Sequence, residues 1–84
     1  MYLALELRAE IETALDAATE ADRAELRVAV RLDAWQREGG AAYSDGPVKT
    51  VLDALQRSYA AELDESLARG STDELRERVR DRVG

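Results

Sequence analysis

Apolar residues recur at steps of three and four along most of the chain, and the clearest run lies between Pro47 and Arg69. This spacing places side chains on one side of an α-helix. Ser44-Asp45-Gly46 precedes the run and Gly70 follows it, and such residues are typical of helix ends. We therefore expect one long helix over residues 47–69, with the other helices packed against its apolar side. That side comprises Val48, Val51, Leu52, Leu55, Tyr59, Leu63 and Leu67.

Three shorter segments show the same helical spacing. They cover residues 2–18, 23–38 and 72–83. The first carries an apolar stripe at every fourth position, and so does the last. We predict an all-α fold, a small four-helix domain over residues 1–84 with one long helix. The two stripes are Leu3, Leu7, Ile11, Leu15 and Ala18, and then Leu75, Val79 and Val83.

The segment over residues 23–38 is apolar on two sides. Its sides carry Leu26, Ala29 and Val30, and nearly opposite them Val28, Leu32 and Trp35. A helix with this pattern is usually covered twice, so either it lies in the middle of the bundle or Val28, Leu32 and Trp35 meet a partner protein. Trp35 fits a core position whose indole N–H reaches a carbonyl, or alternatively an interface. Asp33 lies on the Leu26 side and there needs an arginine partner, Arg37 or one from another helix.

Turn and cap residues separate these segments. Thr19 or Asp22 is expected to cap the second helix, and Gly39-Gly40 to end it. Pro47 suits the first turn of the long helix, with Ser44 or Asp45 as its cap. Tyr43 is expected to fold back onto the apolar side of the bundle. For the last helix, Ser71 and Glu74 have the spacing of a capping box.

Composition supports the helical fold and argues against catalysis. Phe is absent, Ile occurs once, and Ala, Leu, Glu and Arg, which favour helices, dominate the 84 residues. The sequence contains no cysteine and no histidine. It therefore lacks the commonest general base and the usual metal ligands. We expect no enzyme activity, no catalytic residue, no metal site and no cofactor.

The net charge of −6 disfavours binding to DNA or to an anionic membrane. No signal peptide or membrane-spanning run is recognisable, so a cytoplasmic protein is expected. The acidic side of the first helix reads as a solvated face, or alternatively as a docking surface for a basic partner. The last helix alternates four arginines with four acids. We expect those arginines to form ion pairs within their own helix.

The order of these features resembles the amino-terminal helical domain of the GatB/YqeY family. The resemblance rests on Leu26-Arg27 after the break, Val51-Leu52 with Leu55, Ala68-Arg69-Gly70, and Asp73-Glu74-Leu75. It implies a helical module, and in the tRNA-dependent amidotransferase of this family the helical tail contributes to tRNA binding. The long helix retains only Arg57 where the family usually has a basic run.

Two functional hypotheses follow. The first is a non-catalytic helical module resembling GatB/YqeY that is an accessory to tRNA-dependent amidation or tRNA charging, with Arg27, Arg31 and Arg57 as RNA or partner contacts. The alternative is a homodimeric protein-interaction module or small regulator with no RNA role, whose interface contains Val28, Leu32 and Trp35. The expected partner is another protein or a second copy, and the net charge argues against tRNA.

Overall fold

The computed structural model describes residues 2–64 and 71–84, and those residues form five α-helices and no strand. The all-α prediction is confirmed. None of the described helices is long and apolar enough to cross a membrane. The helices are α1 (Tyr2–Ala17), α2 (Glu20–Arg31), α3 (Ala34–Arg37), α4 (Pro47–Leu63) and α5 (Ser71–Val83).

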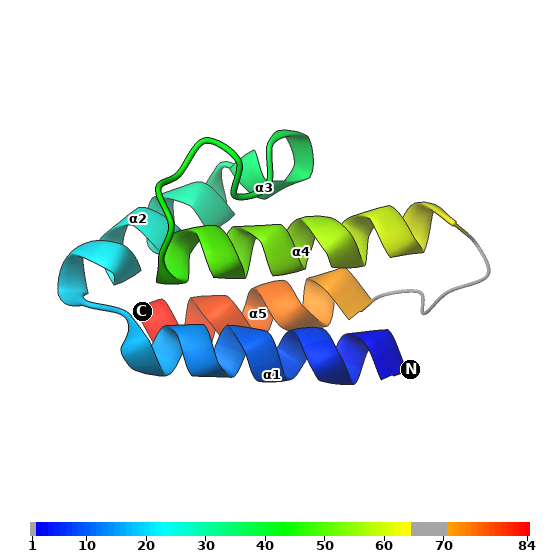
Figure 1. The fold of residues 1–84 in the computed structure, drawn as a ribbon, viewed down its shortest axis with the longest axis horizontal. Helices are drawn as coiled ribbons and strands as arrows, with labels where there is room; N and C mark the ends of the chain where they lie inside the picture. Colours follow the sequence, from blue (N-terminus) through cyan, green and yellow to red (C-terminus); the bar gives the residue numbers. More distant parts are fainter. Residues whose placement is uncertain (1, 65–70) are drawn as a thin grey trace.

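The long helix α4 lies at the centre of the arrangement. It contacts each of the other four helices, while α5 contacts α1, α2 and α4. Figure 1 shows α1 on one side of α4, and α2 and α3 on the other. The predicted role of α4 as the element that the other helices cover is therefore confirmed. Its buried residues are Val48, Val51, Leu52, Ala54, Leu55 and Ser58.

The predicted stripe of α4 is correct only as far as Tyr59. Leu63 is 69% exposed, and the helix ends there because Asp64 has extended backbone angles (φ −93°, ψ 100°). The prediction of a continuous helix to Arg69 is therefore wrong at Asp64, and residues 65–69 lie outside the described residues. Polar contacts also join α4 to α5. Ser58 Oγ accepts a hydrogen bond from Thr72 Oγ1 (2.9 Å), and the Thr72 N–H donates to Glu62 Oε1 (2.6 Å).

The predicted helix over residues 23–38 is divided in two. Asp33 adopts the left-handed conformation (φ 54°, ψ 32°), so α2 ends at Arg31 and α3 begins at Ala34. Aspartate tolerates this conformation better than most residues do. The Asp33 carboxylate forms an ion pair with Arg76 of α5 at 2.6 Å, which agrees with the expected arginine from another helix. The continuous second helix was a wrong prediction because periodicity alone does not reveal this break.

The turn at Asp33 directs Trp35 into the core. Trp35 is 1% exposed, packs edge-to-face on Tyr59 with ring centroids 5.5 Å apart, and lies under the Arg76 guanidinium. The core position predicted for Trp35 is thus confirmed. Its indole Nε1 is buried without a hydrogen-bond acceptor, so the expected bond to a carbonyl is absent.

The helix caps in the structure agree in part with those predicted from the sequence. Thr19 and Asp22, predicted as alternatives, act together in a capping box, in which each side chain accepts from the other residue's backbone N–H (3.1 and 2.9 Å). Pro47 occupies the first turn of α4 as expected, but the cap is Gly46 and the helix start has no side-chain cap bond from Ser44 or Asp45. Tyr43 packs against the core, as predicted. The side chain of Ser71, predicted to cap the last helix, lies outside the described residues.

The loop before α4 is held by a close backbone contact at Gly40. The Gly40 N–H donates to Asp53 Oδ1 of α4 at 2.7 Å. A Cβ at this position would collide with the carbonyl oxygen of Lys49 and lie 2.7 Å from Asp53 Oδ1. Only glycine allows the loop to approach α4 so closely.

We predict that Gly40→Ala lowers the free energy of unfolding by about 1–3 kcal/mol, the usual cost of overpacking a tight site. Urea denaturation followed by circular dichroism measures this change. The control is Ala42→Ser in the same loop, where the side chain is exposed and the expected change is within about 0.5 kcal/mol. An unchanged midpoint for Gly40→Ala would show that the loop is free to move away from α4.

Candidate functional site

Among the described residues, no group of three or more acidic, histidine or cysteine side chains is placed to hold a metal ion. A shallow, mostly apolar groove lies between α1 and α4, and it contains one acid, Glu10, among small side chains. Such a lining offers no nucleophile paired with a base.

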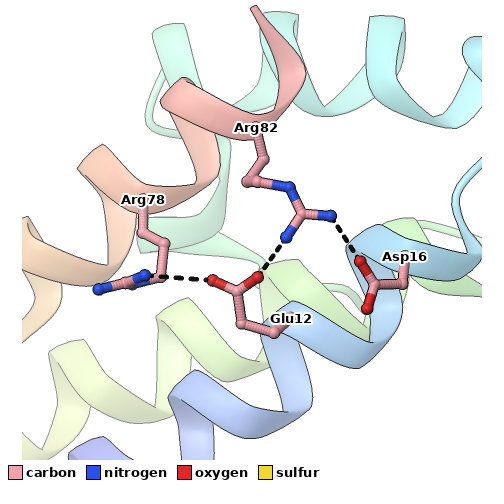
Figure 2. Close-up of polar contacts among 4 residues, drawn as sticks. All are labelled: Glu12, Asp16, Arg78 and Arg82. Atoms are coloured by element: carbon pink, nitrogen blue, oxygen red, sulfur yellow. Dashed lines mark hydrogen bonds and ion pairs between the residues drawn. The ribbon is translucent and has the colours of Figure 1, made fainter.

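Three arginines of α5, namely Arg76, Arg78 and Arg82, pair with acids outside their own helix. Figure 2 shows Glu12 of α1 between Arg78 and Arg82, with Asp16 bound to Arg82 as well. The Arg78–Glu12 and Arg82–Asp16 distances are 3.3 and 2.6 Å. The hydrogen bond to Asp16, with the nearby charge of Glu12, raises the pKa of Arg82 above its ordinary value. These arginines are thus neutralised as expected, but across helices and not within α5.

The acidic side of α1 is partly occupied in the same way. Besides Glu12 and Asp16, Glu10 pairs with Arg57 of α4 at 3.1 Å. These three carboxylates serve to join α1 to α4 and α5. Because they already have arginine partners within the chain, the hypothesis of a docking surface for a basic partner on this face loses its main support.

A different environment surrounds the C-terminal end of α5. Arg27 and Arg31 of α2 and Arg80 of α5, with Val83 and Gly84, line a cavity of about 320 Å³, here called the arginine pocket. The Arg27 guanidinium donates from Nε and from one terminal nitrogen to the Val83 carbonyl oxygen, at 3.0 and 2.5 Å. A volume near 300 Å³ lies at the lower end of ligand sites, so the pocket suits one charged group better than a whole cofactor.

Two of these guanidinium groups are without a carboxylate. Among residues 2–64 and 71–84, neither Arg31 nor Arg80 forms an ion pair. Arg27 is bonded to a neutral carbonyl, and no side-chain carboxylate of the described residues pairs with it. Three positive charges around one cavity repel each other and favour an anion there. In a chain of net charge −6, this concentration of positive charge is local.

Two exposed apolar side chains follow the pocket arginines along α2. Val28 is 56% exposed and Leu32 is 66% exposed. Like Arg27 and Arg31, they lie four positions apart, so the two pairs form adjacent lines along the helix. We name Arg27, Val28, Arg31, Leu32 and Arg80 together the α2 surface.

The residues predicted as contacts separate into two places. Arg27 and Arg31 lie together in the arginine pocket, whereas Arg57 lies with Glu10 between α4 and α1. Val28 and Leu32 are exposed as an interface requires, but Trp35 is buried and does not belong to that surface. The correction for Trp35 has the same cause as the helix break, since the turn at Asp33 changes its direction.

Arg80 is the residue of this surface that the sequence analysis did not identify. It stands in a neutral segment, next to the buried Val79 and three residues before the buried Val83. Its position beside the stripe predicts that it borders a neighbouring helix. Sequence spacing does not show which helix that is, and only the packing of α5 on α2 brings it to Arg27 and Arg31.

Comparison of the chain with protein-family models, with curated proteins and with solved structures finds no match. The resemblance to the GatB/YqeY family therefore stays a hypothesis.

We predict that Arg27→Gln destabilises the protein, because it removes the charged donors that cap the Val83 carbonyl at the end of α5. The expected loss is about 1 kcal/mol in the free energy of unfolding. Arg31→Gln is the matched control on the same helix and is expected to change it by less than about 0.5 kcal/mol. Urea denaturation compares the two variants, and equal midpoints would contradict the structural role of Arg27.

Proposed function

We propose that this chain is a non-catalytic helical module that binds a partner protein through the α2 surface. One observation supports this proposal above the others: Arg31 and Arg80 line one cavity with no carboxylate partner in the described part of the chain, beside two exposed apolar side chains. Arginine is enriched at protein interfaces, and the buried centre of an interface is more apolar than its rim. The side chains required for catalysis have no counterpart in this surface.

The resemblance to the GatB/YqeY family suggests the setting in which such a module acts. It supports an accessory role in an assembly for tRNA-dependent amidation or tRNA charging. Direct tRNA binding by this chain has less support, because the net charge of −6 repels phosphate and Arg57 lies apart from the arginine pocket. We therefore assign the contact with the assembly to protein and not to RNA.

Photo-crosslinking in cells that naturally produce the protein tests this assignment. A photoreactive residue at position 32 is expected to give one discrete adduct that resists nuclease. The control places the same residue at Thr13, which is exposed on α1, and is expected to give no such adduct. Adducts from both positions, or from neither, would contradict binding through the α2 surface. A nuclease-sensitive adduct would instead support the tRNA hypothesis.

A homodimer is the second candidate, because Val28 and Leu32 are exposed on one helix face. Our proposal expects a monomer of 9.3 kDa in light scattering, since two copies each carrying −6 repel one another. A mass twice that value at micromolar concentration would contradict this expectation. If Val28→Ser with Leu32→Ser then restored the monomer, the α2 surface would be a self-association surface.

A further inference from the structure

The charge state of the arginine pocket indicates what kind of group it receives. Its three guanidinium groups have only one acceptor in the described structure, the Val83 carbonyl, and that acceptor carries no net charge. Carboxylates and phosphates accept paired N–H bonds from guanidinium groups. The group that completes this pocket is therefore an anion with at least two acceptor oxygens.

The apolar part of the α2 surface indicates which of the two anions, a carboxylate or a phosphate, fits better. Val28 and Leu32 lie directly beside Arg27 and Arg31 and expose more than half of their area. A phosphate group has no apolar surface to cover two aliphatic side chains, whereas a protein segment that carries a carboxylate can place aliphatic side chains beside it. Long-range charge gives the same preference, because a polyanion is repelled by the net charge of −6 more strongly than a short segment with few acids. Both arguments favour a carboxylate carried by protein.

The spacing of the surface indicates the shape of that segment. The arginine pair and the apolar pair each repeat after four residues, which is the repeat of facing residues on an α-helix. A helix with acids along one edge and aliphatic residues beside them presents the complementary pattern. The acidic helix α1 of a second copy is a poorer match, because its Glu10, Glu12 and Asp16 are already paired with arginines of the same chain. Two chains that each carry −6 also repel one another.

We propose that the α2 surface binds an acidic amphipathic helix of a partner protein. One of the helix carboxylates enters the arginine pocket between Arg27, Arg31 and Arg80, and its aliphatic side chains cover Val28 and Leu32. This inference rests on the proposed function and adds the chemical class of the partner.

Titration of the ¹⁵N-labelled full chain with a designed helix tests this proposal. The probe is a peptide of about 18 residues, or five turns, with leucine and glutamate repeating at the spacing of α2, and its matched control has glutamine for every glutamate. The amide resonances of α2 and of the last turn of α5 are expected to shift, and the glutamate peptide is expected to bind at least about tenfold more tightly than the glutamine peptide.

Variants of the protein test which residues contribute to the affinity for the peptide. Arg31→Gln with Arg80→Gln is expected to weaken the glutamate peptide about tenfold and to leave the fold unchanged, since neither residue has a carboxylate partner among residues 2–64 and 71–84. Val28→Ser with Leu32→Ser is expected to weaken both peptides. Arg57→Gln is the control, because Arg57 is an arginine outside the α2 surface and pairs with Glu10. Thermal melts confirm that each variant is folded.

Several results would overturn the inference. Equal affinity for the two peptides would show that carboxylates do not contribute to binding. Resonance shifts centred on the groove between α1 and α4 would show that the helix binds there and not at the α2 surface. tRNA serves as a further probe. If tRNA bound the α2 surface more tightly than the glutamate peptide does, the ligand of this surface would be a nucleic acid and not an acidic helix. A failure to bind the glutamate peptide overturns the inference alone if crosslinking at position 32 still yields a protein adduct. Without that adduct, the proposed function fails as well.

Discussion

The arrangement of this molecule depends on covering a wide apolar face of α4. The buried positions of that helix extend over roughly half of its circumference at 100° per residue, which is more than one neighbouring helix covers. Helix α1 packs along one flank, and α2, α3 and α5 share the rest. A straight second helix would carry Trp35 to the outside beside Leu32. The left-handed turn at Asp33 solves this problem, because it redirects Trp35 onto Tyr59 while α2 stays against α5.

Charge then fixes how the covering helices are placed. The acids of α1 face Arg57 of α4 and the arginines Arg78 and Arg82 of α5, so an acidic helix is held between two basic edges. Exposed pairs of this kind add little to stability singly. They do disfavour other orientations of α1, since a rotated helix would bring its acids towards solvent and leave the arginines unpaired. Because the acids of α1 neutralise Arg78 and Arg82, the positive charge that remains on α5 lies on the side that faces α2.

Periodicity identifies what is buried in this chain more reliably than where helices stop. The central residues of the three stripes, Ile11, Leu52 and Val79, are all buried, because each lies within a segment whose spacing has one interpretation. The break at Asp33 was missed, since no glycine or proline marks it and its compensation comes from Arg76, more than forty residues away. Arg80 was missed for the same physical reason. Whether an arginine is paired depends on the acids of neighbouring helices, and local sequence shows only those of its own helix.

Three arginines in one small pocket are understandable once the end of α5 is considered. The C-terminal end of a helix carries unsatisfied carbonyls and a partial negative charge, which repel an anion. Arg27 offsets that effect by donating to the Val83 carbonyl, and this bond also holds its side chain in place. The remaining positive charge of Arg31 and Arg80 is then free to act on a ligand. A guanidinium that folding has already ordered loses less freedom when an anion arrives, so the contact that anchors α5 also prepares the α2 surface for binding.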